Sequence, residues 1–356
     1  MNRRAFLVLV PFSALALTEY AQAAPEIIAT GCRSGPVVAT PYYRASALTL
    51  GGMQTHWLPR AQAFAQSAAE LERSVRAASS PTSAMRLAWV RCMLDWERLA
   101  AVPVGAVLER RSVRTLDFWP TRTVQIQELL QSANTQEPAL LANRVRAAGV
   151  GAKGLPALEW LLWHQANEPG TRALASALCA ELHAEAAVLL QDYQARARAP
   201  EAVDEAQSWT DYGEWFTQCM GSLDQLRLKK MRANTRGKDS AIWVRGVSGQ
   251  TAPAWAEQWE SIAFFLAGSA ARRCGAANEA PHSFTDLLRS RGHLAPADRL
   301  ERQLAISQQA VLAANPSRPA SVQRAQQALL ALHTLASDMG SQLFDFSQGF
   351  TDADGD

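Results

Sequence analysis

The sequence lacks the short motifs that identify three large enzyme classes. Its 356 residues include no His-Glu-x-x-His zinc motif, no Gly-x-Ser-x-Gly nucleophile elbow and no phosphate-binding loop. These absences argue against a zincin protease, an α/β-hydrolase and a P-loop nucleotidase. The chemistry of this chain has to be sought in longer-range patterns.

Cysteines are also few, and the net charge of the chain is small. The five cysteines show no Cys-x-x-Cys pair and no zinc-type spacing, and their odd number leaves at least one unpaired. Cys92, Cys179 and Cys219 fall within helical patterns, where we expect small core residues. Cys32 and Cys274 lie in less regular sequence and are open to a disulfide. A formal net charge of +2 with scattered basic residues predicts no nucleic-acid surface.

A strongly apolar run occurs at the N-terminus. Arg3 and Arg4 precede the apolar stretch 5–17, and residues 21–23 read Ala-Gln-Ala, a small-x-small cleavage site. This pattern predicts a cleavable signal peptide over residues 1–23, in a run too short to span a bilayer. The two arginines also resemble the twin-arginine export signal, so the general and the twin-arginine routes both stay open. We expect a periplasmic protein that does not span the membrane.

Apolar residues repeat at helical spacing through most of the chain. The longest seams alternate steps of three and four residues, as in a helical bundle. They comprise Trp57, Ala61, Phe64, Ala68, Leu71, Val75 and Ala78; Met85, Trp89, Cys92, Trp96 and Leu99; and Val322, Ala325, Leu329, Leu332, Ala336, Met339, Leu343 and Phe346. Apart from a short fragment near residues 242–244, no β alternation is convincing. The sequence predicts an all-α protein.

The helical segments fall into two groups that meet near residues 199–204. We expect a signal peptide at 1–23, an N-terminal extended segment at 24–54, a first helical bundle at 55–200, a second at 201–348 and an acidic tail at 349–356. Each group holds enough helices to close its own core. The predicted fold is therefore two packed antiparallel bundles of the four-helix type.

The most informative stretch runs from Gly154 to Trp163 and reads Gly-Leu-Pro-Ala-Leu-Glu-Trp-Leu-Leu-Trp. Gly154 ends a loop, and Pro156 lies in the first turn of a helix, where its missing N–H costs nothing. Glu159 shares an apolar face with Leu155. A carboxylate on such a face needs a counter-charge, hydrogen bonds, a metal or a proton. Glu159 is thus either a structural residue or part of a binding site.

This stretch resembles the Gly-x-His-x-x-Glu motif of the imelysin family, also called the peptidase M75 family, whose members are periplasmic or outer-membrane-associated bacterial proteins. Gly154 and Glu159 match the motif, and Pro156 stands at the His position. Further likeness lies in Met85-Arg-Leu-Ala-Trp89, Trp96-Glu97, Val104-Gly105 and Asp117-Phe-Trp-Pro120. The resemblance covers roughly residues 50–345. It implies a fold of two four-helix domains.

The resemblance also implies an acidic cluster. In imelysin-like proteins the motif Glu gathers with acidic residues of the preceding helix and loop, and this cluster has been proposed to bind metal. By their order along the chain, Glu97 and Asp117 are the candidates that join Glu159. Three carboxylates without an imidazole favour a hard cation such as Ca²⁺ or Fe³⁺ over zinc. Trp119 and Trp163 lie beside these positions and are candidates for lining a ligand cleft.

The proline at the His position has a consequence for such a site. We expect weaker metal binding than in relatives with the complete motif, because one ligand is missing. Restoring it with Pro156→His should then raise the affinity. Mutual repulsion of the remaining carboxylates favours their protonation, and an arginine nearby would turn the cluster into salt bridges.

Structural interpretations remain open for each candidate. Asp117 is also placed to cap a helix beginning near Pro120, and Glu97 to pair with a nearby arginine. The arginines in question are Arg98, Arg110 and Arg114. Tryptophans at helical spacing are typical of a core. The basic run within residues 227–238 is either a solvated helix end or a surface for an anionic partner.

Three functions are compatible with these residues. The preferred hypothesis is an exported, non-catalytic imelysin-like protein that takes part in uptake. It would bind a small ligand or a metal cation, either iron or calcium. The second is an M75-type metallopeptidase, which needs a metal-bound water although Pro156 removes one expected ligand. The third is a structural or interaction module with a protein partner in the cell envelope.

Overall fold

A computed structural model describes residues 40–77, 82–135, 137–165, 170–200, 202–233, 242–269 and 279–346. The predicted signal peptide, the acidic tail, Cys32 and Cys274 lie outside these ranges. The elements within them are helices, and no β-strand occurs among the described residues. The all-α prediction is confirmed.

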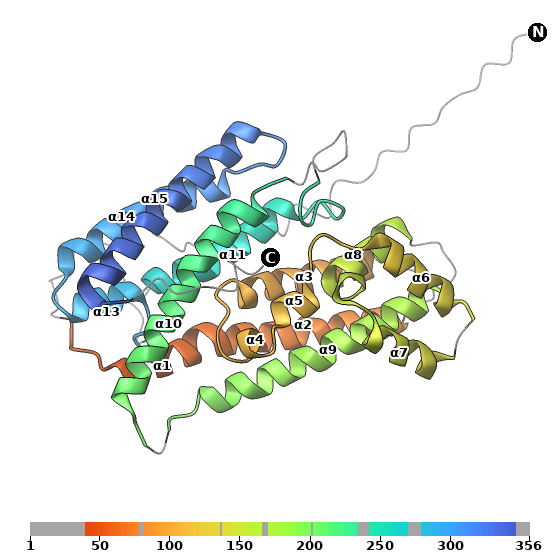
Figure 1. The fold of residues 1–356 in the computed structure, drawn as a ribbon, viewed down its shortest axis with the longest axis horizontal. Coiled ribbons are helices and arrows are strands. Elements are labelled where there is room, and N and C mark those ends of the chain that lie inside the picture. Colours follow the sequence, from red (N-terminus) through yellow and green to blue (C-terminus); the bar gives the residue numbers. More distant parts are fainter. Residues whose placement is uncertain are drawn as a thin grey trace, which may run out of the picture.

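Three long helices form the first half of the molecule (Figure 1). They are α2 (Leu58–Ala77), α3 (Ser83–Ala100) and α9 (Thr171–Arg196). Helix α2 packs against both α3 and α9. The predicted seam from Trp57 to Val75 is fully buried at each of its positions, and so are Trp89 and Trp96 on α3. The three-and-four spacing therefore gave the correct buried face.

Shorter helices pack along this half. They are α4 (Ala106–Glu109), α5 (Ser112–Leu116), α6 (Thr123–Ala133), α7 (Pro138–Ala147), the 3₁₀ turn η4 (Val150–Ala152) and α8 (Gly154–His164). Helix α8 packs on α3, α5 and α9. It starts where the sequence predicted, with Pro156 in its first turn.

Four long helices form the second half. They are α10 (Glu205–Asp224), α11 (Thr251–Ala267), α14 (Leu294–Leu312) and α15 (Pro319–Phe344). Helix α10 continues into the π-helical segment η5 (Gln225–Lys230), and α13 (Phe284–Ser290) precedes α14. Helix α15 packs on α10 and α14, and α11 packs on α14.

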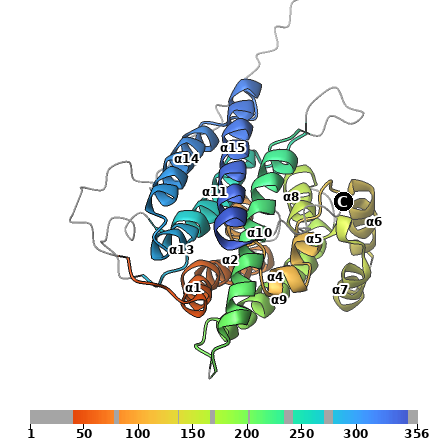
Figure 2. The same cartoon turned by 60° about the vertical axis from the view of Figure 1, so that its left-hand side comes forward.

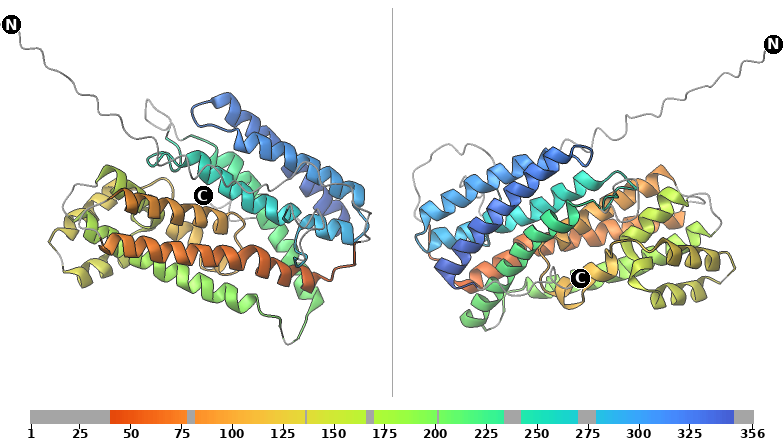
Figure 3. Two further views of the ribbon diagram at one scale, coloured as in Figure 1. Left: turned by 180° about the vertical axis from the view of Figure 1, so that it is seen from behind. Right: turned by 45° about the horizontal axis from the view of Figure 1, so that its top comes forward.

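The two halves lie side by side, as the rotated views show (Figures 2 and 3). The chain passes from one to the other between Arg196 and Glu205, close to the predicted boundary. Helices α3 and α11 make the main contact between the halves. This contact is the frame on which the candidate site is built.

The N-terminal segment differs from the sequence prediction. Residues 24–54 were expected to be extended, whereas α1 (Ala45–Gly52) and the π-helical η3 (Met53–Trp57) run directly into α2. Helix α1 packs against α10 of the second half. A Cβ atom at Gly51 would lie 2.1 Å from the carbonyl oxygen of Pro281. Gly51 is thus a point of close packing within a helix.

Helix α9 alone among the described helices has the length and hydropathy of a candidate membrane span, whereas the sequence was expected to contain no spanning segment. Its apolar side, with Leu174, Leu178, Leu182 and Leu189, is buried in the first half. The same composition is typical of the central helix of a bundle.

The cysteines that the structure describes are core residues. Cys92, Cys179 and Cys219 are fully buried, as predicted. Burial raises the pKa of each thiol. His183, one turn after Cys179, instead has its Nδ1 atom 2.6 Å from Oε2 of Glu72. Cys179 is thus a buried thiol, and the His183 ring contacts the buried Glu72 carboxylate and not the thiol.

Candidate functional site

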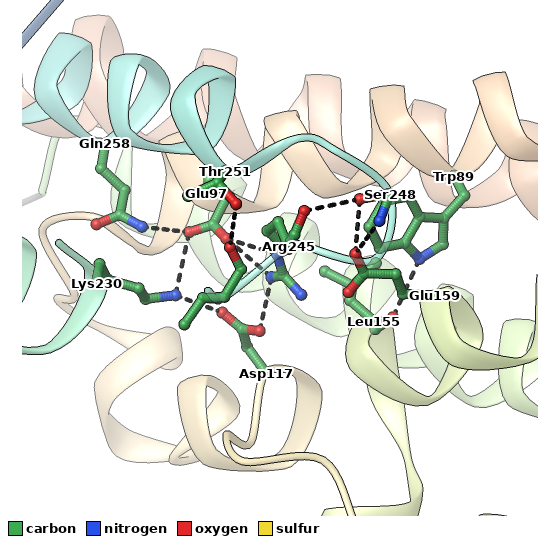
Figure 4. A network of polar contacts seen from close by, with 11 residues as sticks. Trp89, Glu97, Asp117, Leu155, Glu159, Lys230, Arg245, Ser248, Thr251 and Gln258 are labelled. Carbon is green, nitrogen blue, oxygen red and sulfur yellow. Dashed lines mark hydrogen bonds and ion pairs between the residues drawn. The ribbon is translucent and has the colours of Figure 1, made fainter. Parts of the chain in front are cut away.

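The candidate site lies between the two halves (Figure 4). Glu97 is near the end of α3, Asp117 directly follows α5, and Glu159 is on α8. The second half contributes Lys230, the last residue of η5, and the loop 242–250 that precedes α11. The structure thus gathers the three predicted carboxylates in one region and brings basic residues to them.

Gly154 allows the end of α5, which precedes Asp117, to pack closely against the start of α8. Its φ angle is +68°, a backbone conformation that favours glycine. A Cβ atom here would lie 2.1 Å from the carbonyl oxygen of Leu116, the last residue of α5. The end of α5 therefore rests directly on the start of α8, and this contact fixes the position of Asp117.

Glu159 is 3% exposed and lies on the apolar face that the sequence indicated. Its Oε1 atom accepts hydrogen bonds from the backbone N–H of Ser248 at 2.9 Å and from the Ser248 hydroxyl at 2.6 Å. Burial raises the pKa of Glu159, although the positive charge of Arg245 and the Ser248 hydrogen bonds oppose the rise. Glu159 therefore takes up a proton more readily than an exposed glutamate does.

Glu97 receives donors on both carboxylate oxygens. Its Oε1 atom accepts from Nε of Arg245 at 2.9 Å. Its Oε2 atom accepts from Nζ of Lys230 at 3.4 Å and from the side-chain amide of Gln258 on α11. The carboxylate is 2% exposed and is nevertheless fully hydrogen-bonded.

Asp117 completes a ring of alternating charges. Its Oδ1 atom lies 2.6 Å from Nη2 of Arg245, and its Oδ2 atom lies 2.9 Å from Nζ of Lys230. Burial by itself would raise the pKa of Asp117, but Arg245 and Lys230 together lower it. The same pairing raises the pKa of Lys230 in spite of burial. Glu97, Arg245, Asp117 and Lys230 form a closed cycle of ion pairs, which we call the ion-pair ring.

The loop that carries Arg245 is held by its own hydrogen bonds. Arg245 is 1% exposed and has a φ angle of +61°. Its carbonyl accepts from the N–H of Gln250 at 2.9 Å, and the hydroxyl of Thr251 donates to the carbonyl of Val244 at 2.8 Å. The guanidinium carbon lies 5.9 Å from the ring centre of Trp89. A left-handed backbone at a bulky residue persists only where its surroundings hold it in place.

The tryptophan candidates lie at the margin of the cluster. Trp163 is half-buried, with its ring centre 5.2 Å from that of Trp89 and the Arg86 guanidinium carbon 5.4 Å away. Trp119 is half-buried in the segment after α5. Trp89 and Trp96 are core residues, and Trp89 donates through Nε1 to the carbonyl of Leu155 at 3.1 Å.

One structural alternative is wrong, and the other holds with a different partner, because Glu97 does pair with an arginine, Arg245. Asp117 does not cap the next helix, because α6 starts at Thr123 without a side-chain cap. Glu97 does not pair with any of the three arginines that were suggested by sequence. Arg98 pairs with Glu257, and Arg110 with Glu185. The partners of Glu97 come from the other half of the molecule, more than a hundred residues away.

Sequence reasoning missed most of the residues that satisfy the carboxylates. Lys230 was counted in the exposed basic run, yet it continues the buried seam Cys219, Leu223 and Leu226 with the next helical step. That spacing is a signal that could have identified it. Arg245 and Ser248 lie in a loop without periodicity, where the sequence carries no comparable signal.

Residues 149–154 also carry the spacing Gly-x-Gly-x-x-Gly. In a dinucleotide-binding fold this spacing follows a strand and opens a helix. Here α7 precedes it, and Gly154 serves the contact with Leu116. The spacing therefore has a packing role.

The residues present do not fit a metal ion in this arrangement. The four oxygens of Glu97 and Asp117 already accept from cationic side chains, and Oε1 of Glu159 accepts twice from Ser248. A metal between these carboxylates would lie beside a guanidinium and an ammonium group. Within the described ranges, no set of three or more His, Cys, Asp or Glu side chains has a metal-holding arrangement.

Comparisons with known proteins agree with this fold. The solved structure of an imelysin-like protein from Psychrobacter arcticum 273-4 matches with a TM-score of 0.64 at 15% identity, over 88% of this chain and 100% of that one. A "putative iron-regulated protein A precursor" from Parabacteroides distasonis ATCC 8503 matches with a TM-score of 0.66 at 12% identity, over 87% of this chain and 97% of that one. At these identities the likeness shows the fold alone.

A search of curated proteins found no match. The model of the imelysin family, Peptidase M75, matches residues 57–339 and so spans most of the chain, including each member of the ion-pair ring. The protein therefore belongs to the imelysin family.

Proposed function

We propose that this chain is an exported, non-catalytic imelysin-family protein that binds a ligand in the periplasm. The proposal rests on the state of Glu159, which is 3% exposed and accepts two hydrogen bonds from Ser248. A metallopeptidase carboxylate has to reach a metal-bound water and the scissile bond. The loop that carries Ser248 covers Glu159, so its carboxylate can reach neither a metal-bound water nor a scissile bond.

Export and metal handling are supported by similarity and by the N-terminus. Residues 1–23 have the pattern of a cleavable signal peptide. The Parabacteroides distasonis relative is named as a precursor and as an iron-regulated protein. We therefore propose a role for this chain in the uptake or handling of iron or another metal in the periplasm, with the metal carried by an organic ligand and not bound as a bare cation.

A groove between the two halves is the proposed ligand-binding site. It has a volume of about 1080 Å³ and is lined by residues of α1, α4, the end of α9 and α10. Trp209 and Trp215 contribute apolar surface. The charged lining residues are mostly acidic: Glu109, Asp204, Asp211, Glu214 and Asp345 outnumber Arg196 and Arg198. An organic ligand with an apolar body and a positively charged group fits such a wall better than a bare cation does.

The peptidase alternative is tested by digestion of a peptide library with the full chain and with Glu159→Gln. We expect neither protein to cleave above background, with and without added Zn²⁺ or Ca²⁺. Cleavage by the native chain that Glu159→Gln abolishes would contradict the proposal.

Ligand binding in the groove is tested by calorimetry with two tripeptides, Lys-Phe-Lys and Glu-Phe-Glu. We expect Lys-Phe-Lys to bind and Glu-Phe-Glu not to bind. Glu214→Lys should weaken the affinity for Lys-Phe-Lys several-fold, because it replaces an exposed carboxylate by a positive charge that repels the peptide. Glu128→Lys, an exposed position on α6 outside the groove, is the matched control. Failure of Lys-Phe-Lys to bind, or unchanged binding to Glu214→Lys, would count against the groove as the ligand-binding site.

A further inference from the structure

The ion-pair ring joins residues from the two halves of the molecule. Glu97 and Asp117 belong to the first half, whereas Arg245 and Lys230 belong to the second. The side chains of Arg245, Glu97 and Asp117 are 3% exposed or less, and that of Lys230 is 16% exposed. Two positive and two negative groups are thus removed from water together.

The charges of the ring balance without any outside ion. Each carboxylate receives one contact from the guanidinium group and one from the ammonium group. Two clustered carboxylates without a counter-ion would repel each other and protonate, yet the pKa of Asp117 is lowered because Arg245 and Lys230 more than offset burial. The counter-charge that a metal would supply in an acidic site is already present in the chain.

One loop serves all three carboxylates. Arg245 donates to Glu97 and Asp117, and Ser248, three residues later, donates to Glu159. The Ser248 hydroxyl also lies 3.2 Å from the carbonyl oxygen of Arg245. The loop is anchored by hydrogen bonds at both ends, so a metal could reach the carboxylates only by displacing it.

We propose that Arg245 and Lys230 are the resident cations of this centre. They occupy the position between Glu97 and Asp117 that the family resemblance assigns to a metal, and they hold the two halves together. In this chain the acidic cluster therefore links the two halves by ion pairs. This inference goes beyond the proposed function, and it stands whether or not the groove binds a ligand.

The proposal is tested by thermal unfolding and calorimetry of the full chain with Ca²⁺ and with ferric nitrilotriacetate. The native chain should show no metal-dependent shift in Tm. Arg245→Gln should unfold at a lower temperature and should bind at least one of these metals about tenfold tighter or more, because a nearby positive charge is gone. The gain should vanish in the double variant Arg245→Gln with Glu97→Gln.

Two further proteins complete the experiment. Lys230→Gln removes the more exposed cation and gives a second route to the same gain if Arg245→Gln does not fold. Arg110→Gln is the control, since it breaks an exposed pair with Glu185 outside the ring. Stoichiometric metal binding by the native chain that Glu97→Gln abolishes would overturn the proposal, and so would folded variants that gain no affinity. The native titration decides the matter if neither variant folds.

Discussion

Arg245 donates from Nη2 to Oδ1 of Asp117 over 2.6 Å, although 128 residues separate the two along the chain. Both side chains are buried, and they come from opposite halves of the molecule. Breaking a buried pair by removal of one partner is costly, because the other charge stays behind without compensation. The relationship makes the acidic cluster part of the interface that holds the halves together.

Adding even a methyl group at the contact between α5 and α8 should destabilise the protein. Gly154→Ala places a Cβ atom against the backbone of Leu116 at a positive φ angle. We expect a loss of about 3 kcal/mol or more in the free energy of unfolding, from steric overlap and backbone strain together. Urea denaturation measures it.

Gly249→Ala is the matched control for that substitution. Its φ angle is +74°, but no atom lies within 4 Å of the added Cβ. The expected loss is about 1–2 kcal/mol from backbone strain alone. Equal losses for the two variants would show that the α5–α8 contact is looser than described.

Glu159 should make stability depend on pH. Its pKa in the folded protein is raised above 4.5, mainly by burial, so its favourable contribution is complete below pH 4.5 and is lost as the pH rises through the folded pKa. Glu159→Gln can still accept from Ser248 and does not titrate. We expect its stability relative to the native chain to improve between pH 4.5 and pH 7 in urea denaturation.

The exposed Glu128→Gln is the comparison for this effect. It should leave the pH profile of the native chain unchanged. A profile for Glu159→Gln that runs parallel to the native one would mean that Glu159 is no less readily ionised in the folded protein than in the unfolded chain.

His56 should weaken the fold in mild acid. It is fully buried beside Arg60 and His282, with Nε2 3.0 Å from the Ser261 hydroxyl. Burial, Arg60 and His282 lower its pKa well below 6.5. The unfolded chain therefore gains a proton below pH 6.5 that the folded protein does not, and stability should fall by up to about 1.4 kcal/mol per pH unit from this residue.

His56→Gln should flatten that slope between pH 7 and pH 5, whatever its effect on absolute stability. His164→Gln, at an exposed position at the end of α8, should leave the slope as it is. An unchanged slope in His56→Gln would assign the acid sensitivity to other groups.

Restoring the family motif should not by itself create a metal site. The sequence predicted that Pro156→His raises metal affinity, but in the structure Arg245 and Lys230 would still neutralise Glu97 and Asp117. We expect no metal-dependent rise in Tm for Pro156→His and a clear rise for Pro156→His combined with Arg245→Gln. A rise with Pro156→His alone would mean that the loop yields to an incoming metal.

The helices were predictable because their buried faces repeat at helical spacing. The seam from Trp57 to Val75 and that from Met85 to Leu99 are buried as predicted. Helix α1 was not predicted, and it contains two glycines, Gly51 and Gly52, that allow close packing against neighbouring segments although glycine disfavours a helix. Spacing reports which face is buried, and it does not distinguish a break from a close approach.

The candidate site was predictable only on its acidic side. Glu97, Asp117 and Glu159 follow a family pattern in the first half, and the structure brings them together. Their donors lie in the second half, on a loop and at the end of a π-helical segment. A partner that approaches through tertiary packing leaves no periodic trace in the sequence, so Arg245 and Ser248 could be found only in three dimensions.

The most direct measurement is a crystal structure of the native chain grown with Ca²⁺ and ferric nitrilotriacetate, with anomalous diffraction recorded at the iron edge. We expect the Arg245 guanidinium and the Lys230 ammonium groups to lie between Glu97 and Asp117, with no anomalous peak there. An anomalous peak bridged by Glu97, Asp117 and Glu159, with loop 242–250 displaced, would contradict the assignment of Arg245 and Lys230 as resident cations.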